Sequence, residues 1–199
     1  MTRFIFDLDG TVSAEETLPL IASSFGIEEE IGALTQETIA GNIPFIDSFI
    51  RRVEILSPIP VSEINTLLGR VRLYPAVLDF IQRNKRNSVI ATGNLDCWVD
   101  MLLNRIGVES YTSSALVKDN RIAQITAILK KEDIVRMYKE RGDTVVFIGE
   151  GHNDVEAMRL ADVSIASALT HPPANSVLSI ADHVVFAEDA LCRLLNQLS

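Results

Sequence analysis

Short apolar runs alternate with helical patterns along most of this chain of 199 residues. Continuous apolar runs bounded by turn residues are typical of buried strands, and apolar positions three and four residues apart predict helices. Strands that alternate with helices predict an α/β fold, in which a parallel Rossmann-like sheet carries helices on both faces. The predicted strands are Arg3–Asp7, Ser88–Ala91, Ser114–Val117, Thr144–Ile148, Val163–Ala166 and His183–Phe186.

Three of the intervening helices carry their own start or stop signals. Pro75 opens one helix, because proline is favoured in the first turn. Gly107 and Gly142 close two others, because glycine readily adopts the left-handed conformation that follows a last turn. The sequence Lys118-Asp119-Asn120 predicts the tight turn of a small hairpin beside the sheet.

The segment of residues 14–73 breaks the alternation, because it contains no convincing central strand. A helical subdomain inserted after the first strand would lie over the carboxyl ends of the strands, where open α/β sheets bind ligands. We therefore predict a core domain of residues 1–13 and 74–199 and a helical cap of residues 14–73. The predicted cap helices are Leu18–Phe25, Glu29–Ala40, Pro44–Leu56 and Val61–Val71.

Composition and charge narrow the class of partner. The chain is 47% hydrophobic and 23% charged, which excludes a disordered protein. A net charge of −9 argues against nucleic acid or an anionic membrane as the main partner. The sequence shows no apolar stretch of membrane-spanning length, and we expect no signal peptide because the first residues form a strand pattern followed by acids. Since Cys97 and Cys192 are far apart, we expect two buried, unpaired thiols and a reduced, cytoplasmic location.

Two carboxylates follow the first strand in the sequence FIFDLDGT. Asp7 and Asp9 lie on one side of the strand exit, and Gly10 lets the backbone turn away. Unpaired carboxylates beside a core are unfavourable, and a Mg²⁺ ion would compensate both of them. The alternative is a simple Asx turn at Asp9-Gly10.

Three further clusters recur later in the chain. Thr92, with the backbone of Gly93, follows the second strand and could bind a phosphate. Lys130-Lys131 begins a helix whose dipole opposes a lysine there, which favours an external anion, although both could be solvated surface lysines. The stretch Gly149–Asp154 could complete a metal site, or its Asn153 and Asp154 could only cap a helix.

The four clusters, in this order, resemble the motifs of the haloacid dehalogenase-like phosphohydrolases over nearly the whole chain. The resemblance implies that Asp7 is the nucleophile that takes the phosphoryl group. Asp9 would protonate the leaving alcohol and then deprotonate the attacking water. Thr92 and Lys131 would neutralise charge on the phosphoryl group. Apolar residues three and four positions later favour Lys131, and Lys130 stays the alternative.

The same resemblance implies a Mg²⁺ ion as cofactor. Asp7, the backbone carbonyl of Asp9 and an acid of the fourth motif, Glu150 or Asp154, would hold it. Glu150 stands where the family usually has aspartate, and its side chain is longer by about 1.5 Å. Glu150 must therefore take a different rotamer or bind the metal through water.

The predicted cap resembles that of phosphoserine phosphatases. The resemblance implies that Glu16 and Arg52 hold the ammonium and carboxylate of an amino acid. Ser13 and Glu16 could instead form a capping box, but Pro19 would then lie inside the helix, so a helix starting near Thr17 is favoured.

Arg52 follows Phe45 by seven residues, on the helix face that also carries Phe49, and it could instead be a solvated surface residue. An arginine above an aromatic wall suits a carboxylate. Phe45, Gly93 and Asn153 complete the expected substrate site. Asn94 stands where phosphoserine phosphatases usually have glycine, and Gly10 where they usually have serine.

These features predict a Mg²⁺-dependent phosphomonoester hydrolase that acts through an aspartyl-phosphate on a small phosphorylated metabolite. O-Phosphoserine is the leading candidate, and another small phosphate is the alternative. A phosphotransferase would share the chemistry and differ in the acceptor. A binding protein with a degenerate site, suggested by Glu150, is the third hypothesis. The histidines, including His171, have no partner that the sequence identifies, and we predict no role for them.

Overall fold

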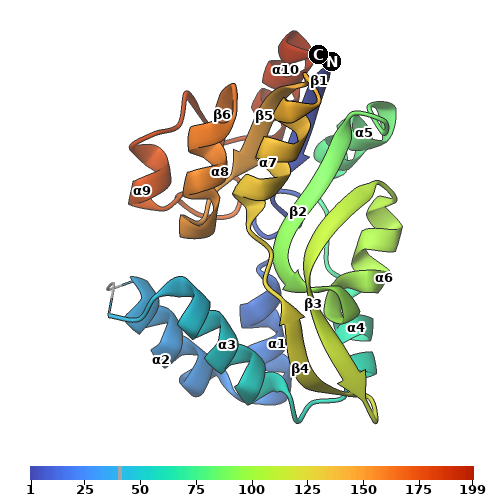
Figure 1. The fold of residues 1–199 in the computed structure, drawn as a ribbon, viewed down its shortest axis with the longest axis vertical. Helices are drawn as coiled ribbons and strands as arrows, with labels where there is room; N and C mark the ends of the chain where they lie inside the picture. Colours follow the sequence, from blue (N-terminus) through green and yellow to red (C-terminus); the bar gives the residue numbers. More distant parts are fainter. Residues whose placement is uncertain (40–41) are drawn as a thin grey trace.

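The computed structural model describes residues 1–39 and 42–199, without the side chains of Ile39 and Phe45. In this part of the chain, seven strands form one sheet in the order β4-β3-β2-β1-β5-β6-β7 (Figure 1). All neighbouring strands are parallel except β3 and β4, which form an antiparallel hairpin. The predicted α/β class is confirmed. The strands are β1 Thr2–Phe6, β2 Ser88–Leu95, β3 Glu109–Lys118, β4 Arg121–Ala127, β5 Thr144–Gly149, β6 Val163–Ser167 and β7 His183–Val185.

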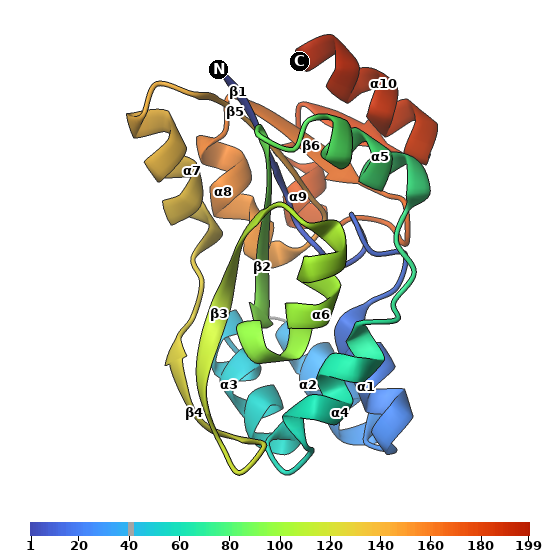
Figure 2. The same cartoon turned by 90° about the vertical axis from the view of Figure 1, so that its right-hand side faces the viewer.

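Helices cover both faces of the sheet (Figure 2). Side chains alternate along β1, so Phe4 and Phe6 face one core while Ile5 faces the other. The first core packs under α5, α6 and α10, and the second packs under α7, α8 and α9. These helices are α5 Pro75–Arg83, α6 Asp96–Ile106, α7 Lys131–Glu140, α8 Val155–Leu160, α9 Asn175–Leu178 and α10 Glu188–Leu198.

Four helices lie between β1 and α5, on the side where the loop after β1 leaves the sheet (Figure 1). The two chain segments that lead into and out of them run side by side. The Ala14 N–H donates to the Arg72 carbonyl over 2.8 Å, and the Tyr74 N–H donates to the Val12 carbonyl over 3.0 Å. The division into core and cap at these segments stays a prediction. The helices are α1 Thr17–Phe25, α2 Glu28–Ile39, α3 Phe45–Leu56 and α4 Val61–Leu68.

Most predicted boundaries agree with the structure to within one or two residues, and three do not. Strand β3 begins at Glu109 rather than Ser114, because the residues from Glu109 onward pair with β2. Strand β2 continues to Leu95 instead of ending at Ala91, because β3 still pairs with Thr92 and Leu95, with an irregular register between them. Helix α4 ends at Leu68 rather than Val71, because tighter turn bonds from the Arg70 and Val71 N–H groups replace the helical pattern.

The predicted hairpin turn at residues 118–120 is confirmed. It places Asp119 and Asn120 at φ values of 50° and 60°, which these two residue types tolerate better than most. The Asn120 carbonyl also accepts a 2.8 Å hydrogen bond from the Val61 N–H, so the hairpin is tied to the start of α4.

The cysteines are both free, as predicted, but Cys97 and Cys192 are half-buried rather than buried. They lie at helix faces that pack only partly against the first core. Among the described residues, no helix combines the length and the apolar character needed to span a bilayer.

Candidate active site

The predicted site residues gather at the carboxyl ends of adjacent strands. Asp7 directly follows β1, Thr92 lies on β2 and Glu150 directly follows β5. Because these strands are neighbours in the sheet, their ends open onto one pocket of about 180 Å³. Its lining residues are Asp7, Asp9, Glu16, Thr17, Leu18, Phe49, Arg52, Val53, Thr92, Gly93, Asn94, Trp98, Glu150 and Asn153.

A buried lysine joins two carboxylates at the base of this pocket. The Lys131 Nζ atom lies 2.5 Å from Asp7 Oδ1 and 2.6 Å from Asp154 Oδ1. The other oxygen of Asp154 accepts the backbone N–H groups of Glu150 and Gly151, both over 2.9 Å. Asp154 is therefore held by three donors, while no described residue hydrogen-bonds to Oδ2 of Asp7.

At the bottom of the pocket, the Lys131 ammonium group lies among several buried carboxylates. Burial and the nearby Asp154 carboxylate raise the pKa of Asp7 well above its usual range, although Lys131 opposes this. Burial lowers the pKa of Lys131, but the Asp154 and Asp7 carboxylates outweigh burial and raise it above its ordinary value. Lys131 is thus a fixed positive charge at the end of β1. Lys130, the alternative, is exposed.

Asp9 is held by two donors from different parts of the chain. Its Oδ1 atom accepts the Thr17 N–H over 2.8 Å, and its Oδ2 atom accepts the Asn94 side-chain amide over 2.7 Å. Burial raises the pKa of Asp9, and the bonds from Thr17 and Asn94 only partly offset this. Asn94, noted in the sequence for replacing a glycine, therefore positions Asp9.

Thr92 has a hydroxyl group that is free to donate. Its Oγ1 atom accepts the backbone N–H of Asn94 over 3.2 Å and the Asn94 side-chain amide over 3.1 Å. The hydroxyl hydrogen can thus point into the pocket, toward an acceptor such as a phosphate oxygen. Gly93 and Asn153 lie beside it in the pocket wall.

Glu150 is the least satisfied of the carboxylates. Only 6% of its surface is exposed, and its Oε2 atom has no hydrogen bond within the described structure. Burial, followed by the charges of Asp7, Glu16 and Asp154, raises the pKa of Glu150 to about 10. Oxygen atoms of Asp7, Glu150 and Asp154 lie within 4.8 Å of one another, a spacing that a shared cation would stabilise.

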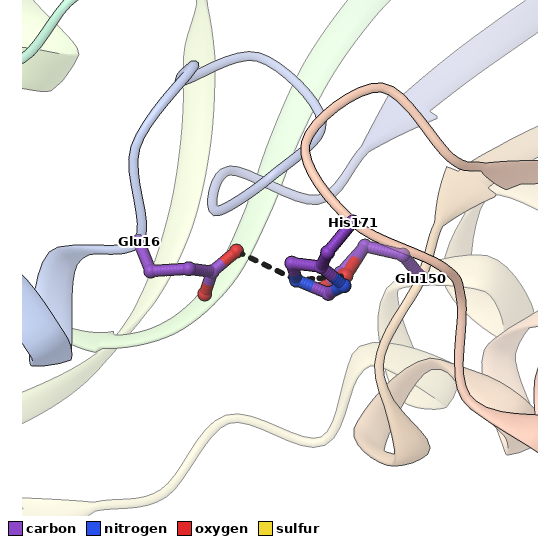
Figure 3. A group of neighbouring side chains, drawn as sticks. All are labelled: Glu16, Glu150 and His171. Carbon is purple, nitrogen blue, oxygen red and sulfur yellow. Dashed lines mark hydrogen bonds and ion pairs between the residues drawn. The ribbon is translucent and has the colours of Figure 1, made fainter. Parts of the chain in front are cut away.

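A histidine lies between Glu16 and Glu150, and the sequence gave no reason to select it. The His171 Nε2 atom lies 3.0 Å from Glu16 Oε1 and 3.1 Å from Glu150 Oε2 (Figure 3). The sequence identified no partner for His171, and the structure supplies two. Its loop after β6 returns to the site, and 155 residues separate it from Glu16, so no local pattern could have revealed the contact.

The helical side of the pocket carries one cation and an apolar wall. Arg52 donates from Nη2 to Thr35 Oγ1 over 3.2 Å, while its buried Nε atom has no hydrogen-bond partner among the described residues. The indole Nε1 atom of Trp98, which sequence reasoning missed, is also buried and unpartnered. Phe49 lines the pocket near Arg52, whereas the side chain of Phe45 lies outside the described part of the structure.

Helix α1 begins at Thr17, as the position of Pro19 predicts, and this leaves Glu16 just before the helix with its side chain in the pocket. The capping-box alternative is excluded, because the Ser13 hydroxyl donates to the Leu8 and Glu15 carbonyls instead.

Known proteins resemble this chain in sequence and in fold. A model of the haloacid dehalogenase-like hydrolase family matches residues 4–159. The phosphoserine phosphatase of Halobacterium salinarum is 27% identical to this chain, and the alignment covers 98% of each of the two chains. That of Methanocaldococcus jannaschii is 26% identical, with 81% of this chain and 83% of the relative covered. A substrate-bound phosphoserine phosphatase structure superimposes with a TM-score of 0.80 at 23% identity, covering 99% of this chain and 98% of that one, which shows the shared fold.

Proposed function

The chain belongs to the haloacid dehalogenase-like hydrolases and is a phosphatase, and we propose that it hydrolyses O-phosphoserine with Mg²⁺ through a phosphorylated Asp7. The proposed substrate rests on one observation: Glu16 and Arg52 line the same pocket above Asp7. A carboxylate and a guanidinium complement the ammonium and the carboxylate of an amino acid. The curated relatives that act on phosphoserine support the same substrate.

Arg52 is prepared for an anion. Burial lowers the pKa of Arg52, because the guanidinium loses hydration, yet the group stays charged. Its Nε–H group, which has no partner among the described residues, would donate a hydrogen bond to a substrate carboxylate. Phe49 and Val53 on the same helix exclude water beside it, and this strengthens the charge-assisted bond.

Mg²⁺ fits the acidic group at the base of the pocket. Asp7, Glu150 and Asp154 offer the hard oxygen ligands that this ion prefers, and Glu150 Oε2 is an orphaned acceptor. Together with the Asp9 backbone carbonyl, these residues would hold it, either directly or, for Glu150, through water. When bound, Mg²⁺ supplies positive charge against the transferring phosphoryl group.

Asp7 is the nucleophile in this proposal. Lys131 binds its Oδ1 atom, so Oδ2 is the oxygen that attacks phosphorus while the bond from phosphorus to the seryl oxygen breaks. Lys131 and the Thr92 hydroxyl stabilise the charge on the phosphoryl oxygens. The fixed lysine also favours ionised Asp7, which is the form that attacks.

Asp9 is the general acid and the general base in this proposal. Burial raises the pKa of Asp9, so its carboxyl group can hold a proton for the departing seryl oxygen. The resulting carboxylate then takes a proton from water as the water attacks phosphorus, and inorganic phosphate leaves Asp7. Thr17 and Asn94 keep the carboxyl group of Asp9 oriented through both steps.

The test is release of inorganic phosphate from a panel of small phosphomonoesters, with and without Mg²⁺. We expect Mg²⁺-dependent turnover that favours O-phosphoserine. Arg52→Ala should lose this preference while it still cleaves an aryl phosphate. Arg51→Ala is the matched control, because Arg51 is the exposed neighbour on the same helix.

A broad preference that Arg52→Ala leaves unchanged would contradict the assigned substrate and keep the Asp7 chemistry. The same assay with added alcohols separates hydrolysis from phosphoryl transfer, because only transfer yields a phosphorylated acceptor in place of free phosphate.

A further inference from the structure

Glu16, Glu150 and His171 direct three possible metal-binding atoms toward one another. The His171 Nδ1 atom lies 3.0 Å from the Pro172 carbonyl oxygen, which can only accept a hydrogen bond. Nδ1 is therefore the donor in this contact, and Nε2 is the ring nitrogen that can bind a metal ion. Nε2 faces two carboxyl oxygens at 3.0 and 3.1 Å (Figure 3). A positive species among these three atoms would compensate the carboxylate charge.

The distances suit a metal ion as that species. Zinc binds histidine nitrogen and carboxylate oxygen at about 2.0–2.2 Å, which puts two ligands of one tetrahedral ion about 3.4 Å apart. The ligand atoms of Glu16, Glu150 and His171 all lie within 4.8 Å of one another, so small rotations would complete the geometry. The Nδ1–H bond to a carbonyl is also the arrangement that orients histidine ligands in metal sites.

Two independent observations support a ligand at this position. Within the described part of the chain, Glu150 Oε2 is buried and has no hydrogen bond, although it lies 3.1 Å from His171 Nε2. Gly10 provides the space, since a Cβ atom there would lie 2.8 Å from Glu16 Oε1 and 3.4 Å from Glu150 Oε2. The His171 side chain is 43% exposed, so an ion can reach the group from solvent.

We propose that Glu16, Glu150 and His171 form a second divalent-cation site, selective for a borderline transition ion such as Zn²⁺ over Mg²⁺. Imidazole is a good ligand for Zn²⁺ and a poor one for Mg²⁺, which prefers oxygen. Three protein ligands leave a fourth position open for water. The site shares only Glu150 with the acidic group around Asp7.

Occupation of this site has a consequence for the proposed reaction. Zn²⁺ would bind the carboxylate of Glu16, which the substrate ammonium group needs, and would withdraw Glu150 from the Mg²⁺ group. Zn²⁺ is therefore an inhibitor of phosphoserine hydrolysis, and His171 is the residue that makes the inhibition specific. This consequence depends on the proposed function, whereas metal binding itself does not.

The test measures Zn²⁺ binding to the metal-free, untagged full chain by competition with a chromogenic chelator, with excess Mg²⁺ present. We expect the native chain to bind one Zn²⁺ ion. The Zn²⁺ affinity of His171→Gln should be at least ~10-fold lower, because loss of a residue that only supports a metal ligand already costs about that much. His183→Gln is the control, because His183 is exposed on β7. The Zn²⁺ affinity of this variant should equal that of the native chain. Equal Zn²⁺ affinity in the native chain and His171→Gln, or no bound Zn²⁺, overturns the proposal.

Nitrogen NMR of the histidine rings gives a second, activity-independent readout. One equivalent of Zn²⁺ should shift the Nε2 resonance of His171, and Mg²⁺ should not. A proton is the competing positive species. An imidazolium spectrum for His171 that Zn²⁺ leaves unchanged would identify the proton and reject the metal site.

Discussion

Lys131 and Asp7, which are 124 residues apart in the chain, form a buried ion pair with 2.5 Å between Nζ and Oδ1. The same ammonium group also binds Asp154. Lys131 therefore has two effects, since it compensates two buried carboxylates in the folded protein and supplies charge beside the proposed nucleophile. These two effects can be separated by experiment.

Replacing Lys131 should destabilise the fold as well as inactivate the site. Lys131→Met leaves two buried carboxylates without their cation, and breaking a buried pair in this way costs about 3–5 kcal/mol. Urea unfolding without metal measures this loss, and Mg²⁺ should restore part of it by replacing the missing charge. Lys130→Met, an exposed control, should change the free energy of unfolding by about 0.5 kcal/mol or less. Equal losses in the two variants would contradict the structural assignment.

Replacing the nucleophile should remove the chemistry and retain the fold. Asp7→Asn keeps the shape of the side chain but cannot form an acyl phosphate, so phosphate release should fall at least about 1,000-fold. Circular dichroism checks that the variant is folded. Full Mg²⁺-dependent activity in Asp7→Asn would reject the proposed mechanism.

Asn94 should act on catalysis through Asp9. Asn94→Leu removes the amide donor from Asp9 Oδ2, so kcat should fall about 10- to 100-fold with little change in KM. The lost hydrogen bond stabilised the ionised form, so the pKa of Asp9 should rise further. The limb of the pH–rate profile that reports Asp9 should then move to higher pH. A profile that does not move would show that Asn94 is not the residue that tunes Asp9.

Replacing Gly10 should affect substrate binding in addition to straining the backbone. Gly10 and Gly142 have φ values of 65° and 83°, so alanine at either position costs about 1–2 kcal/mol of backbone strain. A Cβ atom at Gly10 would also lie 2.8 Å from Glu16 Oε1, whereas a Cβ atom at Gly142 would have no described atom within 4 Å. Both variants should lose similar stability in urea, but only Gly10→Ala should raise the KM for O-phosphoserine. A similar rise in Gly142→Ala would attribute the effect to the backbone alone.

Stability without metal should fall as pH rises. Burial and neighbouring anions raise the pKa of Glu150 to about 10, against an ordinary value of 4.5. The folded state then keeps a proton that the unfolded state releases above about pH 4.5, so this stabilisation is complete below that pH and is lost towards pH 10. The free energy of unfolding should therefore be lower at about pH 9 than at about pH 6.

Mg²⁺ should reverse this trend, because the ion takes the place of the proton. Its stabilising effect should grow with pH, and Glu150→Gln, which has no proton to lose there, should show a weaker pH dependence. Urea titrations at both pH values, with and without Mg²⁺, measure each of these differences. An equal Mg²⁺ effect at the two pH values would contradict the raised pKa.

The sequence by itself determined the order of strands and helices and the clusters around Asp7, Thr92 and Glu150. These signals are local, because each consists of an apolar run and the polar residues that follow it. Neighbouring parallel strands end at the same edge of a sheet, so local patterns were enough to bring the three residues together. The start of α1 was also predictable, because the limits that Pro19 imposes are set by its own ring.

Only the tertiary structure decided which side chains meet across that edge. The contact between His171 and Glu16, the hold of Asn94 on Asp9 and the burial of Lys131 between two carboxylates all join distant segments. Such contacts depend on the path of each loop and on the packing of the helices that anchor it. No periodicity in the chain encodes that path, because it results from the free energy of the whole packed core.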